Sequence, residues 1–173
     1  TSIKNIVLIL KTDENLQGLF KFNEFTSEID VVKDVKLETS IGILKIYKGR
    51  YTDQVINTVE LYIESSKKYR GAVFKNQVID QGVTNVAHMN TYNPVIEYMN
   101  KAYALWDKKH RLETYFVDYL GAPNEETTRL ITTLWFMGAV AKAYNPKVKF
   151  DFVLDLVGGQ GVGKTSLLQK TAP

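Results

Sequence analysis

The sequence has no cysteine, only two histidines and only four prolines among its 173 residues. Without cysteine the chain forms neither a disulfide framework nor a thiolate metal site. The two histidines, His88 and His110, are far apart in the sequence, which argues against a structural zinc site. The chain must therefore be stabilised by an ordinary hydrophobic core.

Long apolar runs are also missing. The run at residues 6–10 is too short for a signal peptide and lacks a small-residue cleavage site. The stretch from 130 to 144 is interrupted by Thr132, Thr133 and Lys142, which makes it too polar to span a bilayer. We therefore expect a cytoplasmic protein that does not enter a membrane. Because the chain begins with Thr1 rather than methionine, we also expect it to be a piece of a longer protein.

The composition is that of a globular protein, with 45% hydrophobic and 24% charged residues. The net charge of +3 neither requires nor excludes a nucleic-acid partner. The length suits one sizeable domain or two small ones.

Residues 1–50 predict a small mixed α/β head. Apolar residues spaced i, i+3, i+4, i+7 within residues 2–11 indicate an amphipathic helix. Alternating residues over 19–25, then 29–32 after a short turn, indicate a hairpin, and residues 42–47 indicate a further strand.

Residues 51–147 predict a helical region. Helices are expected from Thr52 or Asp53, over 74–88, and from Asn93-Pro94 to about 106. A shorter helix over 111–119 closes at Gly121, and the longest runs from residues 123–126 to Asn145-Pro146. Trp135 and Met137 on this longest helix are expected in the core.

Residues 148–173 carry the most specific signal, the pattern G-x-x-x-x-G-K-[ST] at 158–165. The apolar run 152–157 is expected to be a buried strand entering this loop, and a helix is expected to leave it. Such a loop cradles phosphate groups with its backbone amides and the positive end of the following helix. Lys164 would reach the β- and γ-phosphates of ATP, and the Thr165 hydroxyl would hold Mg²⁺. The expected nucleotide-binding residues are Gly158, Gly159, Gln160, Gly161, Val162, Gly163, Lys164, Thr165 and Ser166.

The predicted class is therefore α+β, in three parts. These are the mixed head (1–50), the mainly helical region (51–147) and the first strand–loop–helix unit of a truncated P-loop NTPase domain (148–173). A glycine-rich turn that binds nothing is the alternative to the last part, but a turn needs neither the lysine nor the hydroxyl.

Several stretches, taken in order and spacing, resemble the virulence-associated protein E family, phage- and island-encoded proteins related to superfamily 3 helicases. They are FNEFT (22–26), NPVIEYM (93–99), Trp-Asp at 106–107 with Arg-Leu at 111–112, YLGA (119–122), and YNP (144–146) leading to KFD (149–151) and GQGVGKT (159–165). The family pattern has a glycine after Trp-Asp, where this chain has Lys108.

The resemblance implies an ATPase that acts in the replication of mobile-element DNA within a bacterial host, as a helicase-like or initiator-type oligomer. DNA and a homo-oligomer are then the expected partners, and ATP and Mg²⁺ the expected cofactors. The acidic Walker B strand, the sensor residue and the arginine finger of the family are not in this sequence. We therefore expect no catalytic residue in residues 1–173 and no useful rate of ATP hydrolysis by them alone.

Four questions stay open at this point. The chain can be a DNA- or protein-binding module whose P-loop is idle, or, with a poorer fit, a small-molecule kinase. Basic runs at 67–70 and 108–111 can be solvated helix ends or DNA contacts. A carboxylate–guanidinium clasp of Asp107 and Arg111 at a helix junction, with Trp106 in the core, is preferred to a catalytic role for these residues. The interleaved set of aromatic and basic residues in the head can be a DNA surface or a hairpin with one buried and one solvated face; it comprises Lys21, Phe22, Lys45, Tyr47, Lys48, Arg50 and Tyr51.

Overall fold

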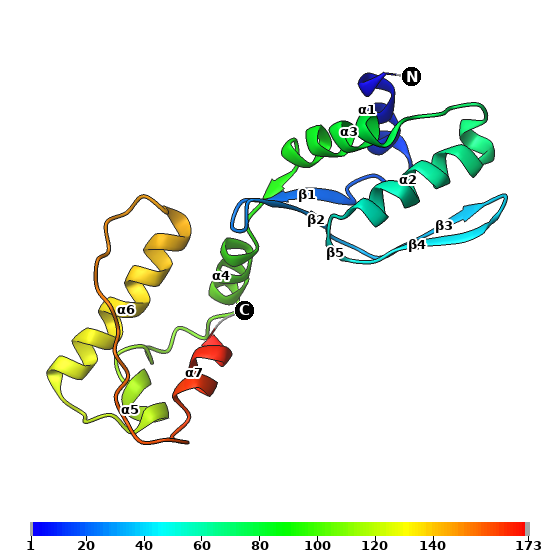
Figure 1. The fold of residues 1–173 in the computed structure, drawn as a ribbon. Coiled ribbons are helices and arrows are strands. Elements are labelled where there is room, and N and C mark those ends of the chain that lie inside the picture. Colours follow the sequence, from blue (N-terminus) through cyan, green and yellow to red (C-terminus); the bar gives the residue numbers. More distant parts are fainter. Residues whose placement is uncertain (1, 172–173) are drawn as a thin grey trace. The chain divides into compact units, whose positions relative to one another are not determined.

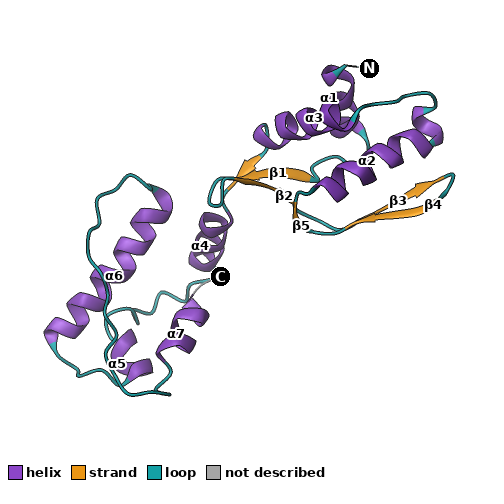
Figure 2. Ribbon diagram, viewed as in Figure 1, coloured by secondary structure: helices purple, strands orange, loops and turns teal. Residues whose placement is uncertain are grey.

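The computed structural model describes residues 2–171, and the chain folds as two units, residues 1–94 and residues 95–173 (Figure 1). Figure 2 shows helices in both units and strands in the first. The class is α+β, as the sequence predicts. The division differs from the three expected parts, because the first two α-helices after residue 50, at 53–65 and 76–88, pack against the head, while the later helices belong to the second unit.

Three helices build the first unit: α1 (Ile3–Thr12), α2 (Asp53–Ser65) and α3 (Asn76–His88). A short 3₁₀ turn, η1 (Lys67–Tyr69), follows α2. Each helix has apolar residues at helical spacing, so each buries one face. The helices α1 and α3 pack on each other, and α3 also covers β1.

Two small sheets complete this unit. In the larger one the strand order is β5 (Gly49–Arg50), β2 (Glu28–Val31), β1 (Phe20–Asn23) and β6 (Thr91–Tyr92). The β1–β2 and β2–β5 pairs are antiparallel, and β6 runs parallel to β1. The second sheet is a hairpin of β3 (Val35–Thr39) and β4 (Gly42–Ile46), against which α2 packs.

The core of the first unit is a continuous cluster of buried residues from α1, α2, α3 and the strands β1 to β4. It contains the inward residues of α1, the aliphatic side chains of α2 and α3, and one face of each sheet. Its largest fully buried side chains include Ile6, Leu10, Phe20, Leu37 and Ile79. This cluster explains why α2 and α3 belong with the strands.

The second unit contains α4 (Pro94–Ala104, whose first residue closes the first unit), α5 (Tyr115–Leu120), α6 (Glu126–Tyr144) and α7 (Lys164–Thr171). Phe116 of α5 is buried and its ring lies 5.9 Å from that of Phe136 on α6. Gly121 ends α5 in the left-handed region with φ +66°, as its position after the helix predicts.

The long helix α6 buries less of its surface than the sequence predicts. Thr132 and Gly138 are its buried residues, and Trp135 is half-buried. Met137 is 61% exposed, so the expectation that Met137 is a core residue is wrong.

Across residues 2–171, none of the helices combines the length and the apolar character that crossing a membrane requires.

Candidate functional site

The glycine loop lies at residues 158–163 and leads directly into α7. Gly161 and Gly163 adopt φ of +83° and +88°, a region that side chains with a β-carbon rarely occupy. The amide of Leu167 donates to the Gly163 carbonyl at 2.9 Å and closes the first helical turn, and the Leu167 side chain is buried. The helix therefore begins at Lys164, where the pattern predicts it.

The side chain of Lys164 turns back over this loop. Its ammonium donates hydrogen bonds to the carbonyl of Gly158 at 2.7 Å and to the carbonyl of Gly159 at 2.8 Å. Thr165 and Ser166 follow in the first turn of α7 and are exposed. One cation and the free amides of a helix start thus lie beside two accessible hydroxyl-bearing residues.

The segment before the loop departs from the expectation. Residues 152–157 form no strand, and Val153 and Val157 are 92% and 90% exposed. The predicted buried strand is therefore wrong for this structure. The reason is that a strand needs a neighbour for its backbone hydrogen bonds, and none of the strands among residues 2–171 pairs with this segment.

A cavity of about 360 Å³ lies against the loop. The end of α5, the turn at 121–123 and the first turns of α6 form one wall, and residues 154–158 with Val162 and Lys164 form the other. Its lining is mainly apolar, with Leu120, Pro123 and Ile131 on the first wall. Pockets of this size and apolar character typically bind small organic groups.

The residues present fit a nucleotide polyphosphate with Mg²⁺. Amides at a helix start and a lysine ammonium are donors that suit phosphate oxygens, and a threonine hydroxyl is an oxygen ligand that Mg²⁺ accepts. Lys164 also lines the apolar cavity, together with Gly158 and Val162 of the loop. The structure thus brings together Gly158, Gly159 and Lys164 by direct hydrogen bonds, and places Thr165 and Ser166 on the same helical turn.

The clasp expected at residues 106–111 is present. Arg111 donates to both carboxylate oxygens of Asp107, at 2.8 and 2.6 Å. The hydrogen bonds from the Arg111 side chain and from the backbone of Lys109 lower the pKa of Asp107 to about 2. Trp106, in contrast, is 37% exposed and not a core residue, because its indole N–H donates to the Lys109 carbonyl at the surface.

The interleaved aromatic and basic set of the head is divided by the fold. Phe22 is half-buried and stacks on His88, with ring centroids 4.2 Å apart, and Tyr51 is half-buried with its ring edge-on to Phe20. Arg50 pairs with Glu28. Phe22 and Tyr51 therefore pack within the first unit, and Arg50 already has an acidic partner. The hairpin interpretation explains these residues better than a DNA surface does.

One family of proteins matches part of the chain. Residues 99–173 match the virulence-associated protein E-like domain. This segment is therefore similar to that family. The matched range of the virulence-associated protein E-like domain covers most of α4, the clasp, α5, α6, the glycine loop and α7, so the resemblance noted in the sequence is confirmed there. A search of curated proteins gives no match.

Sequence reasoning did not find the apolar cavity beside the loop. Its walls come from residues 116–131 and 154–164, and on the first wall only Leu120, Gly121 and Ala122 belong to a stretch that the sequence marks. The one usable signal is the turn at 119–122, which belongs to the family resemblance and ends at this wall.

Proposed function

We propose that the chain is part of an ATP-binding, helicase-like protein of DNA replication, in which the loop at 158–165 holds the phosphates of ATP with Mg²⁺. The observation that carries this proposal is the position of Lys164. It is the first residue of α7, and its ammonium lies 2.7 Å from the carbonyl of Gly158, the first residue of the glycine loop.

In this proposal each residue of the loop has one role. Lys164 exchanges its two carbonyl partners for β- and γ-phosphate oxygens, which are stronger acceptors because they are charged. The amides from Gly159 to Lys164 donate to the phosphates, and Gly161 and Gly163 allow the backbone to approach them. Thr165 binds Mg²⁺, and the metal neutralises phosphate charge. We assign no catalytic residue among residues 2–171.

The apolar cavity beside the loop takes the nucleotide base in this proposal. The cavity shares Gly158, Val162 and Lys164 with the loop, so phosphates on the loop and a base in the cavity can belong to one molecule. The wall of Leu120, Pro123 and Ile131 offers apolar contact to an aromatic base.

A second candidate is a nucleic-acid- or protein-binding module whose loop is idle. The exposed segment 152–157 favours it, because P-loop domains hold this segment as a buried strand. The two candidates differ in whether the chain binds nucleotide at all. DNA and assembly into a homo-oligomer are the partners that we propose for the first.

Isothermal titration calorimetry of the chain with MgATP tests the proposal. We expect binding by the wild type and a loss of at least tenfold in affinity for Lys164→Ala. The matched control is Lys142→Ala, which removes an exposed lysine near the end of α6 and should leave binding unchanged. Absence of binding by the wild type, or equal binding by Lys164→Ala, would contradict the proposal and favour the second candidate.

A further inference from the structure

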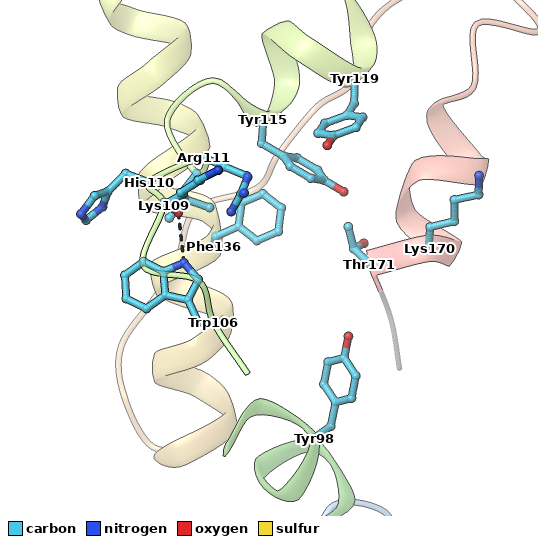
Figure 3. Close-up of a pocket in the computed structure, with 11 residues that line it drawn as sticks. Tyr98, Trp106, Lys109, His110, Arg111, Tyr115, Tyr119, Phe136, Lys170 and Thr171 are labelled. Atoms are coloured by element: carbon cyan, nitrogen blue, oxygen red, sulfur yellow. Dashed lines mark hydrogen bonds between the residues drawn. The ribbon is translucent and has the colours of Figure 1, made fainter. Parts of the chain in front are cut away.

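A second cavity, of about 620 Å³, lies within residues 95–171 and is separate from the glycine loop (Figure 3). We call it the aromatic–basic pocket. Figure 3 shows residues from α4, the 106–112 turn, α5, α6 and α7 around it. Its aromatic lining residues are Tyr98, Trp106, Tyr115, Tyr119 and Phe136.

Some of these rings are fixed and others are accessible. Tyr115 packs with its ring edge-on to Phe136 at 5.2 Å and lies 4.8 Å from the ring of Tyr119. Tyr119 is nevertheless 63% exposed and Tyr98 is 50% exposed. The pocket therefore offers open ring surface on a packed aromatic base, and large open aromatic surfaces commonly mark binding sites.

The charge in the pocket is of one sign. Lys109, Arg111 and Lys170 line it, and none of its described lining residues is acidic. The 106–112 turn contains one carboxylate, that of Asp107, and this carboxylate is already paired with Arg111. A ligand that fits this lining has flat apolar faces and carries negative charge.

The 106–111 turn is ordered by its own contacts. The indole of Trp106 is held by its hydrogen bond to the Lys109 carbonyl at 3.0 Å, and Arg111 is held in a two-point contact with Asp107. The ammonium of Lys108 lies 5.0 Å from the ring of Trp106. Side chains ordered before binding lose little conformational freedom when a ligand arrives, which favours affinity.

We propose that the aromatic–basic pocket binds single-stranded nucleic acid, with bases stacking on Tyr98, Trp106 and Tyr119 and phosphates meeting Lys109 and Lys170. This inference rests on the nucleic-acid part of the proposed function and names the surface that part requires. A single strand presents base faces and one phosphate per base, which matches rings interleaved with cations. A duplex hides its base faces, and an apolar peptide leaves the lysines without partners.

Fluorescence anisotropy with a short labelled oligo-dT tests the inference on the whole chain. We expect the double variant Tyr98→Ala/Tyr119→Ala to weaken binding about tenfold or more, because each substitution removes a ring on which a base stacks. Both rings are at least half exposed, so the fold should tolerate the change. The matched control, Tyr47→Ala, removes a ring that is 66% exposed and lies just after β4, and should leave binding unchanged.

The lysines have their own measurement. For Lys109→Gln/Lys170→Gln we expect a shallower salt dependence, with the slope of log affinity against log salt reduced by about 1.4, since each phosphate contact on a single strand contributes about 0.7. Lys45→Gln on β4 is the control that should leave the slope unchanged. The chain has two tryptophans, so the variant Trp135→Phe leaves Trp106 as the reporter. Quenching of its fluorescence by oligo-dT would place a base on this ring. The variant Trp106→Phe, which retains Trp135, should show no such quenching.

The failures are distinguishable. If the wild type binds no oligo-dT, the nucleic-acid part of the proposed function and the pocket inference are both overturned, while the MgATP result stands by itself. If oligo-dT binds but the pocket variants bind like wild type, only the pocket inference is overturned. Equal affinity for duplex DNA, or displacement of the strand by free AMP at comparable concentration, would also overturn it. Circular dichroism of each variant excludes unfolding as the cause of a loss.

Discussion

Gly82 of α3 faces Ile6 of α1 so closely that a β-carbon on the glycine would lie 2.5 Å from Cγ2 of the isoleucine. Both residues are buried in the core of the first unit. A glycine inside a helix weakens it by about 1 kcal/mol relative to alanine. The close approach of the two helices explains why this position has no side chain.

The substitution Gly82→Ala should therefore destabilise the protein. Alanine improves helix propensity, but its methyl group must displace Ile6 or separate α1 from α3, and overpacking of this kind costs about 1–3 kcal/mol. Urea unfolding followed by circular dichroism measures the change. Gln77→Ala, on an exposed position of the same helix, is the control that should be neutral or slightly stabilising. A stabilised Gly82→Ala variant would show that the helices do not meet as described.

Much of the first unit could be predicted from the sequence, because its helices and longer strands have local apolar patterns. The helix expected over 2–11 is α1, and the hairpin expected over 19–32 is β1 with β2. Strand β3 was missed although Val35 and Leu37 alternate with polar residues, a signal that was available. Strand β6 has two residues and pairs with β1 across nearly seventy positions, so no local pattern indicates it.

The sequence predicted the loop and the helix that follows it, but not the structure of the segment that precedes the loop. The motif located the loop and the start of α7, because glycines and a lysine at fixed spacing have a direct structural meaning. The strand before the loop was not formed, since strand formation depends on partners that a local pattern does not contain. The aromatic–basic pocket was not predicted as a site, because it joins residues as distant as Tyr98 and Lys170.

A buried carboxylate ties the end of α1 to the turn η1. Asp13 is fully buried and accepts hydrogen bonds from the hydroxyls of Tyr62 at 3.0 Å and Tyr69 at 2.6 Å, and from the ammonium of Lys68 at 3.2 Å. Burial by itself raises the pKa of Asp13, but the hydrogen bonds from Tyr69, from the backbone of Asn15 and from its other partners outweigh it, and the pKa lies below the ordinary 3.8. Burial and the hydrogen bond to Asp13 raise the pKa of Tyr69 to about 12.

Replacing this carboxylate should cost stability at neutral pH. The variant Asp13→Asn places an amide N–H₂ group, itself a donor, against the donors that Asp13 accepts from. An unsatisfied buried polar group lowers the free energy of unfolding by about 1–3 kcal/mol. Because the folded pKa is lowered, the contribution of Asp13 is present above the ordinary value of 3.8 and is lost as the pH falls through the folded pKa. Denaturant unfolding at pH 7 and at about pH 3 should therefore show a smaller difference between variant and wild type in acid. A difference that stays constant with pH would contradict this account.

Lys108 adopts φ +65°, in the left-handed region, at the position where the family pattern has glycine. A residue with a β-carbon in this conformation destabilises the fold by about 1–2 kcal/mol. Glycine avoids this strain, although it loses more backbone entropy on folding. We therefore expect Lys108→Gly to be more stable than Lys108→Ala by about 1 kcal/mol, since both variants lose the contact with Trp106 and only glycine relieves the backbone. Thermal unfolding of the two variants side by side measures this. Equal melting temperatures would show that residue 108 leaves this conformation when its side chain is removed.

In the proposed binding mode the base lies in the apolar cavity beside Lys164 and the phosphates lie on the glycine loop, so the two contacts can be tested independently. Ile131 lines the cavity and is 47% exposed, which means that a larger side chain can be placed there without entering the core. Ile131→Trp should fill the space of the base and weaken MgATP binding about tenfold, while binding of inorganic tripolyphosphate, which has no base, should be unchanged. The matched control is Leu130→Trp, because Leu130 is exposed and does not line the cavity. Calorimetry with both ligands distinguishes the outcomes. An equal loss of affinity for MgATP and tripolyphosphate would mean that the tryptophan distorts the loop. Unchanged affinity for both ligands would place the base elsewhere.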